Sequence, residues 1–165
     1  MASYNRGKKQ VCKMLKDRFQ IGDRVLDVGA CNGKWYNLLS NYFVMDAVEV
    51  WKPNILRHNL LKKYNKLFYK DICECDDFNY NIIIMGDILE HLSVKQAQAI
   101  IKKMYNECDE LVVAVPYKIK KGTLWFNPYE RHIQCDLTHE IFMKRYSGFK
   151  LFWGDKRYGY YIKNK

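Results

Sequence analysis

The sequence predicts an α/β fold: a three-layer sandwich around a seven-stranded, mostly parallel sheet that ends in an antiparallel C-terminal hairpin. Three observations lead to this prediction. Short apolar runs alternate with helical patterns through most of the 165 residues, as in parallel sheets covered by helices. A glycine-bearing turn, Gly29–Gly33, follows the first apolar run. Acidic residues then recur at the ends of the later runs.

Each element has its own local signal. Ser93 and Thr138 are expected helix N-caps, because their hydroxyls can accept from unpaired backbone N–H groups. Pro116 ends the fifth apolar run, and no repeat, low-complexity tract or linker interrupts the chain, so residues 1–165 are expected to form one domain. The expected strands are 24–28, 45–50, 66–70, 80–85, 111–115, 149–153 and 158–162. The expected helices are about 4–20, 33–42, 53–64, 93–104 and 138–146.

The first strand and the turn after it predict a ligand site. Gly29 and Gly33 let the backbone turn tightly and come close to a ligand that a Cβ atom would exclude. The helix that opens near Gly33 directs unpaired N–H groups toward that ligand. Asp27 places a carboxylate near the carboxyl end of the strand, where open α/β sheets bind ligands.

Further acids follow the next three strands. Glu49 comes 22 residues after Asp27, the spacing at which an acid of a Rossmann-like unit meets ribose hydroxyls. Asp71 follows the third run, and Gly86-Asp87 follows the fourth. Each acid alone is explained equally well by a solvated loop or a helix cap. Their regular repetition favours one shared site at the edge of the sheet.

Composition indicates a protein of ordinary globular type. Hydrophobic residues make up 48% and charged residues 28% of the chain, and no apolar run is long enough to span a membrane. The N-terminus lacks an apolar signal core, and the six cysteines form no Cys-x-x-Cys pair. These features predict a cytoplasmic protein with reduced thiols. The net charge of +10 keeps a nucleic-acid partner open, although solvated helix faces account for most of the dispersed cations.

The pattern Asp27-x-Gly29-x-x-x-Gly33, Glu49, Asp71 and Gly86-Asp87-Ile88-Leu89-Glu90-His91 resembles the class I S-adenosylmethionine-dependent methyltransferases. The resemblance covers roughly residues 24–163 in the order of the family. A nicotinamide dehydrogenase fits less well, because Ala30-Cys31-Asn32 lacks the middle glycine of Gly-x-Gly-x-x-Gly. The cofactor-binding half would then be about 24–90 and the acceptor side about 91–165.

The resemblance implies a set of cofactor-binding residues. Those near the methionine part would be Asp27 with the turn Gly29, Ala30 and Gly33, and Gly86 with Asp87 at its carboxypropyl side. Glu49 would hold the ribose hydroxyls, with Val50 beside it. The adenine would meet Asp71 and Ile72, and Trp51 would pack on its face or belong to the core.

Two segments carry residues suited to removing a proton from a methyl acceptor. Glu90 and His91 follow the fourth strand, and His132 lies in the long connection after the fifth. Histidine titrates near neutral pH, so either one suits a general base; a cap at a helix start is the alternative for His91. The residues Asn127, Tyr129, Glu130 and Arg131 form the expected acceptor-binding lip.

The acceptor-side pattern also resembles small bacterial and phage-type methyltransferases of unassigned substrate, some of which accompany glycan-modifying enzymes. It runs Asn-Pro-Tyr-Glu-Arg-His-Ile-Gln-x-Asp-Leu-Thr over residues 127–138. The expected reaction is therefore methyl transfer to an O or N atom of a small polar, sugar-like or glycan acceptor. An RNA or DNA methyltransferase and a non-catalytic cofactor-binding module remain alternatives. We expect no metal, because the spacing of Glu90, His91, His132 and Asp136 matches no defined site.

Overall fold

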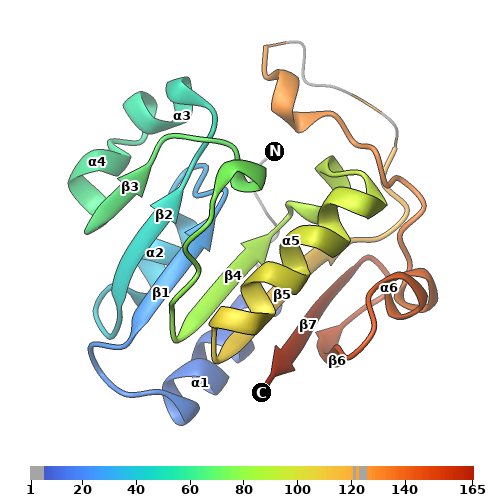
Figure 1. Ribbon diagram of the computed structural model, residues 1–165, viewed down its shortest axis with the longest axis horizontal. Coiled ribbons are helices and arrows are strands. Elements are labelled where there is room, and N and C mark those ends of the chain that lie inside the picture. Colours follow the sequence, from blue (N-terminus) through green and yellow to red (C-terminus); the bar gives the residue numbers. More distant parts are fainter. Residues whose placement is uncertain (1–5, 121, 123–125) are drawn as a thin grey trace.

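The computed structural model describes residues 6–120, 122 and 126–165, and its core is a seven-stranded sheet of order β3-β2-β1-β4-β5-β7-β6 (Figure 1). Neighbouring strands among β1 to β5 are parallel, whereas β7 is antiparallel to both β5 and β6. The predicted fold class is therefore confirmed. The strands are β1 (Arg24–Val28), β2 (Val44–Val48), β3 (Lys66–Phe68), β4 (Ile82–Gly86), β5 (Glu110–Pro116), β6 (Lys150–Gly154) and β7 (Tyr158–Asn164).

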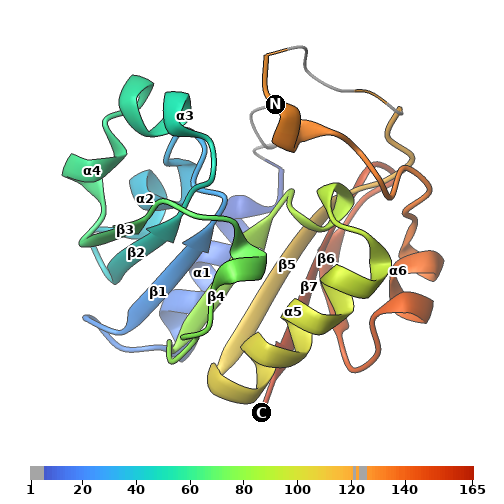
Figure 2. The ribbon, with the colours of Figure 1, turned by 45° about the horizontal axis from the view of Figure 1, so that its top comes forward.

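Helices cover both faces of the sheet. Successive side chains along each strand point to opposite faces, and both faces carry apolar side chains that pack against helices. On one face the core includes side chains of α1 to α4, and on the other those of α5 and α6. Figure 2 shows α5 and α6 in front of the sheet and α1 behind it. The α-helices are α1 (Lys8–Arg18), α2 (Lys34–Leu39), α3 (Lys52–Arg57), α4 (Leu60–Lys63), α5 (Val94–Glu107) and α6 (His139–Arg145). Three 3-10 helices are η1 (Ile72–Glu74), η2 (Leu89–His91) and η3 (Pro128–Glu130).

The predicted helix caps agree with the structure, and several predicted boundaries do not. Ser93 and Thr138 cap α5 and α6 through their hydroxyl oxygens. The single helix expected over 53–64 was wrong: Asn59 has a left-handed φ of 56° and separates α3 from α4. The first helix begins later than expected because Gly7 is left-handed; residues 4 and 5 of that prediction lie outside the described residues.

The parallel direction of β1 to β5 brings their carboxyl ends to one edge of the sheet. Glu49, Asp71 and Asp87 follow β2, β3 and β4 at this edge. β1 pairs with β2 on one side and with β4 on the other. The chain passes from β1 to β2 in one direction across the sheet and from β4 to β5 in the opposite direction, so the strand order switches between β1 and β4. Open α/β sheets bind their ligands at such a crevice.

The segment that follows β5 is fastened over this edge by hydrogen bonds to η2. The backbone N–H groups of Ile133 and Gln134 donate to the carbonyl oxygen of Glu90 at 2.7 and 3.0 Å. The buried Gln134 amide donates to the carbonyl oxygens of Leu89 and Leu92. Its oxygen accepts from Tyr146 Oη at 2.8 Å and also from the guanidinium of Arg145. Every strong hydrogen-bonding atom of the Gln134 side chain is thus engaged.

Among the described residues, no helix combines the length and the apolarity that crossing a bilayer would require.

Replacing Gln134 by Leu should destabilise the protein by about 1–3 kcal/mol, because buried carbonyl and hydroxyl groups lose their partners. We also expect faster hydrogen exchange at the amides of residues 133 and 134. Urea unfolding and exchange mass spectrometry measure the two effects. Gln10→Leu, at an exposed position of α1, is the matched control and should change stability by less than about 0.5 kcal/mol. Equal stability and exchange in both variants would show that Gln134 does not fasten the segment.

Candidate functional site

A cavity of about 590 Å³ lies at the carboxyl edge of the sheet. Its wall contains all the residues that the sequence predicted for the site except Asp27 and Gly33. Residues from the cofactor-side prediction and from the acceptor-side prediction therefore line the same space. The predicted residues in the wall are Gly29, Ala30, Glu49, Val50, Trp51, Asp71, Ile72, Gly86, Asp87, Glu90, His91, Asn127, Tyr129, Glu130, Arg131 and His132.

Glycines are required at two points of the wall. Gly29 has a left-handed φ of 72°, and a Cβ atom there would collide with the side chain of Ile88. A Cβ atom on Gly86 would lie 2.9 Å from Nε1 of Trp35. The absence of a Cβ atom at these two positions lets the side chains of Ile88 and Trp35 pack directly against the turn after β1 and the end of β4.

Glu49 is buried and held by two backbone N–H groups. Its Oε2 accepts from the N–H of Cys31 at 2.7 Å, and its Oε1 accepts from the N–H of Trp51 at 2.8 Å. Burial raises the pKa of Glu49, and these hydrogen bonds act in the opposite direction. The Asn54 side chain also donates to this carboxylate. Since a carboxylate has about four lone-pair sites, about one remains for a further donor such as a ligand hydroxyl group.

Asp27 differs from its expected place, because its side chain is buried beneath the turn and is absent from the cavity wall. Its Oδ2 accepts from Tyr64 Oη at 2.5 Å. Burial raises the pKa of Asp27 to about 6. Gly33 is also outside the wall; it has a left-handed φ of 75° and precedes α2 as its N-cap. Asp27 and Gly33 therefore support the turn between β1 and α2 without lining the cavity.

Asp71 and Trp51 lie at the β2 and β3 side of the cavity. The carboxylate of Asp71 accepts from the N–H of Cys73 at 2.8 Å and caps η1, which fixes the chain beside Ile72. The Trp51 ring lies edge-on to the Tyr129 ring, with 6.2 Å between their centroids. This aromatic contact joins the β2 side of the cavity to the segment after β5.

Asp87 and Glu90 bring two buried carboxyl groups to the wall. Asp87 has a left-handed φ of 57°, and its Oδ1 accepts from Tyr158 Oη at 2.7 Å. Asp87 Oδ2 and Glu90 Oε2 are buried without a hydrogen-bond partner among the described residues. Burial raises the pKa of both carboxyl groups, and the neighbouring Asp87 charge raises that of Glu90 further. Buried polar atoms are normally paired, so these two oxygens indicate a place for a ligand.

His91 and His132 were alternative bases in the sequence, and the structure brings them together. Their ring centroids are 5.0 Å apart. Nδ1 of His91 donates to the carbonyl oxygen of Arg131 at 3.2 Å, and Nδ1 of His132 donates to that of Lys120 at 3.0 Å. Because a carbonyl oxygen only accepts, each neutral ring has its unprotonated nitrogen at Nε2. Burial also lowers the pKa of His91.

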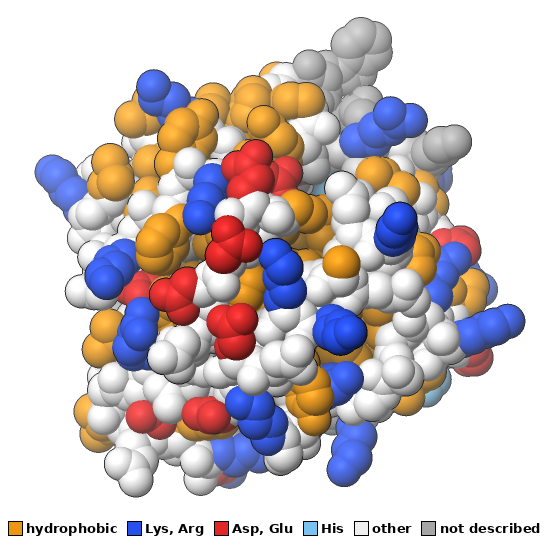
Figure 3. Space-filling view, viewed as in Figure 1, with side chains coloured by type: hydrophobic (Ala, Val, Ile, Leu, Met, Phe, Trp, Pro, Cys, Tyr) orange, Lys and Arg blue, Asp and Glu red, His pale blue; other side chains and the backbone are white. Residues whose placement is uncertain are grey.

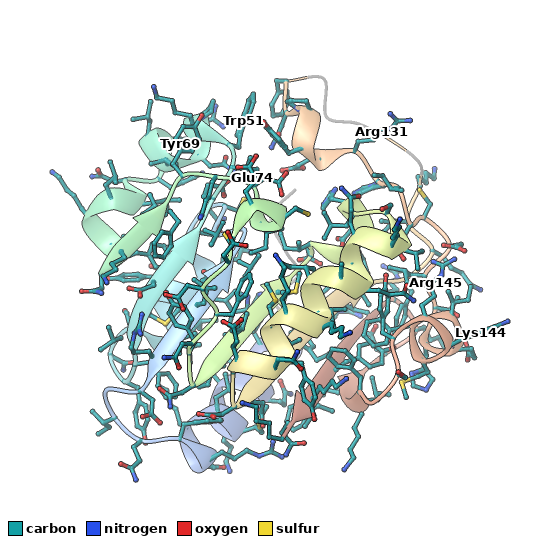
Figure 4. The ribbon with its side chains drawn as sticks, viewed as in Figure 1. Trp51, Tyr69, Glu74, Arg131, Lys144 and Arg145 are labelled. Atoms are coloured by element: carbon teal, nitrogen blue, oxygen red, sulfur yellow. The ribbon has the colours of Figure 1, made fainter. Side chains whose placement is uncertain are left out.

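The predicted lip residues form the outer wall. Asn127 is buried, and its side chain accepts from the N–H of Tyr129, so it shapes η3. Tyr129, Glu130 and Arg131 follow it along the wall. Figure 4 shows Trp51 and Arg131 on opposite sides of this region, whereas Arg145 lies away from it on α6.

Asp136 and Arg145 pair with each other rather than with the site. Two hydrogen bonds of 2.8 and 2.5 Å join the Arg145 guanidinium to the Asp136 carboxylate. The metal-ligand set weighed from the sequence, which needed Asp136 beside the two histidines, is therefore not assembled. Arg145 supports the segment after β5 through Gln134.

Some wall residues were missed by the sequence analysis. Lys34 and Trp35 open α2 directly after Gly33, so their place at the helix N-terminus was a usable signal. Asn54 lies in an expected helix that carried no signal for the site, and Lys120 lies in the long connection after β5. Lys8 of α1 is not part of the wall, but its ammonium is buried over the ring of the wall residue Trp35, at 3.9 Å from the centroid. Burial lowers the pKa of Lys8 to about 8.

Comparisons with known proteins give matches in structure only. No protein-family model matches the sequence, and no curated protein matches it. Many solved structures match the fold.

Three of these structures illustrate the likeness. TehB from Haemophilus influenzae has a TM-score of 0.69 and 14% identity over 95% of this chain; the chain spans 62% of the length of TehB. Magnesium protoporphyrin IX methyltransferase (ChlM) from Synechocystis PCC 6803, with bound SAH (S-adenosylhomocysteine), has a TM-score of 0.65 and 16% identity, covering 94% of this chain and 81% of ChlM. The DhpI–SAH complex has a TM-score of 0.71 and 12% identity, covering 94% of this chain and 83% of DhpI.

At these identities the comparisons establish the fold alone. Together with the strand order and the antiparallel β7, they identify this chain as having the fold of the class I S-adenosylmethionine-dependent methyltransferases.

Proposed function

We propose that the protein is an S-adenosylmethionine-dependent methyltransferase that acts on an O or N atom of a small polar or sugar-like acceptor. The observation that carries this proposal is the placement of Glu49, Asp71 and the Asp87–Glu90 pair in one cavity, each within four residues after the end of a parallel strand. The cavity volume of about 590 Å³ is in the range of small-molecule sites. The fold likeness supports the proposal without naming the acceptor.

The wall residues fit the cofactor. Glu49 keeps an acceptor site after its hydrogen bonds from two backbone N–H groups and from Asn54, which suits a ribose hydroxyl group. Asp71 and Ile72 lie beyond it on the β3 side for the adenine. Gly29 and Gly86 line the cavity at the β1–β4 crevice, where we place the methionine part, and Asp27 supports the turn after β1 through its hydrogen bond from Tyr64.

The chemistry needs little from the protein beyond orientation and proton removal. When bound, the cofactor supplies a methyl group bonded to a positively charged sulfonium sulfur, and the sulfur side of that bond is the leaving group. The lip residues Asn127, Tyr129, Glu130 and Arg131 orient the acceptor in this proposal. In this proposal His91 and His132 act as general bases through Nε2. Their Nδ1 atoms hold the ring protons, because each donates a hydrogen bond to a backbone carbonyl oxygen. Glu90 lies 4.0 Å from Nε2 of His91 and stabilises its protonated form.

A nucleic-acid acceptor is the second candidate, because the chain carries a net charge of +10. In Figure 3 the Lys and Arg side chains are scattered over the face shown, and acidic side chains lie near its centre. A nucleic-acid surface gathers cations along one path. The charge distribution on this face favours the smaller acceptor.

Isothermal titration with S-adenosylmethionine and SAH tests the cofactor assignment. We expect both to bind, and Glu49→Gln should weaken binding by about 10- to 150-fold, because hydrogen bonds to a charged group contribute about 1.5–3 kcal/mol. Glu110→Gln is the matched control, since Glu110 is also buried but starts β5 outside the cavity, beside Arg18. Absence of binding to the unaltered protein would reject the cofactor, and equal losses in both variants would reject the role of Glu49.

Replacing His91 and His132 together by Asn should reduce turnover by about 10²–10⁴-fold while sparing cofactor affinity. Asn keeps an N–H near the position of Nδ1 and removes the basic Nε2. Turnover is measured as SAH release in a screen of glycans, small metabolites and RNA. His58→Asn, at the end of α3 and outside the cavity wall, is the control. Unchanged turnover in the double variant would remove both histidines from the mechanism.

A further inference from the structure

The acceptor side of the cavity presents an unusual set of atoms. Asp87 Oδ2 and Glu90 Oε2 are buried and unpartnered among the described residues. Nε2 of His91 lies 4.0 Å from Oε1 of Glu90, and the His132 ring lies beside it. The Nδ1 protons of both rings are used by backbone carbonyls. When Glu90 is ionised, the atoms left for a ligand are all hydrogen-bond acceptors.

A group that satisfies several buried acceptors must carry several protons. A hydroxyl group donates one hydrogen bond, so with both carboxyl groups ionised it would leave one of the two carboxylate oxygens unpaired, at a cost of about 1–3 kcal/mol. An ammonium group donates three and also carries the opposite charge. Both the charge and the number of hydrogen-bond donors therefore favour an ammonium group as the ligand.

We propose that Asp87, Glu90, His91 and His132 form a subsite for the amino group of the methyl acceptor, so that the reaction is N-methylation of an amine. This inference rests on the proposed function and narrows its substrate class. A bare metal ion is the other compact cation, but the described residues include no group of three or more His, Cys, Asp or Glu side chains arranged to hold one.

The surrounding charges explain how the subsite tolerates two carboxyl groups. Lys8 from α1 and Lys34 from α2 favour the ionised form of Asp87, and Tyr158 from β7 donates to it. Glu130 from η3 and Asp87 itself oppose the ionisation of Glu90. Burial raises the pKa of Glu90, whereas an ammonium group beside the carboxylate favours its ionised form. Affinity for a cationic ligand should therefore increase with pH as Glu90 loses its proton.

The transfer step balances with these groups. The bound ammonium first gives one proton to Nε2 of His91, which leaves a neutral amine. The nitrogen lone pair then forms the N–CH₃ bond while the C–S bond breaks, and its electron pair stays on sulfur as a neutral thioether. The methylated nitrogen carries the positive charge, and the Glu90 carboxylate pairs with it until it leaves.

Sinefungin provides a defined probe, because it replaces the sulfur of SAH by a carbon that bears an amino group where the transferable methyl would be. We expect sinefungin to bind at least tenfold more tightly than SAH at pH 7.5, and this ratio to increase from pH 6 to pH 8. Glu90→Gln should reduce the ratio to near one. Glu110→Gln should retain it, since that buried carboxyl group lies outside the cavity wall. Calorimetric titrations of both ligands give the ratio for each variant.

The outcomes separate this inference from the proposed function. If neither ligand binds, the proposed function fails. If both bind with equal affinity, or the ratio survives Glu90→Gln, the amine subsite is wrong while the cofactor site stands. Two further results would overturn it: Mn²⁺ binding that Glu90→Gln abolishes, or preferred methylation of glucose over glucosamine in the acceptor screen.

Discussion

The parallel pairing of β1 with both β2 and β4 is the constraint on which the rest of the molecule depends. It sends the chain out of the sheet at one edge after each strand, so acids distant in sequence meet at one cavity. The buried apolar strands fix this register, because a shift would move core side chains to the wrong face. Side chains of α1 to α4 on one face and of α5 and α6 on the other fill the core against it.

A second set of interactions, the hydrogen bonds between η2 and the segment after β5, determines the arrangement of the acceptor side of the cavity. The Gln134 side chain and the backbone of residues 133 and 134 tie the segment after β5 to η2. This places His132 beside His91, and the carbonyl oxygens of the same segment set the proton position on both rings. The site therefore combines a wall built on strand ends with a wall built on one long connection, joined by a few buried hydrogen bonds.

Most of the fold could be predicted from sequence, because apolar runs and helix caps are local signals. The break at Asn59 could not, since an apolar helical pattern continues across it and only the left-handed backbone separates α3 from α4. Strand-end position also predicted which acids face the cavity, except at Asp27. The side chain of Asp27 points to the face of β1 that lies beneath the Gly29–Gly33 turn. There it accepts a hydrogen bond from Tyr64, which lies 37 residues away in the chain.

Long-range partners account for the other gaps. The meeting of His91 and His132 depends on how the segment after β5 folds back, and no spacing rule encodes it. The same holds for Lys8, whose burial over Trp35 brings a cation from α1 behind the cavity. Asp136 has the residue type of a metal ligand, but no metal was expected there, and in the structure its carboxylate pairs with Arg145 through two hydrogen bonds.

The most direct test of the central claim is a crystal structure of the protein with SAH. The account predicts the ribose hydroxyls on Glu49, the adenine beside Asp71 and Ile72, and the homocysteine part in the crevice between Gly29 and Gly86. The sulfur should face Glu90 and the two histidines across the cavity. SAH bound elsewhere, or in the cavity with its ribose away from Glu49, would contradict the claim that the strand-end acids form the cofactor site.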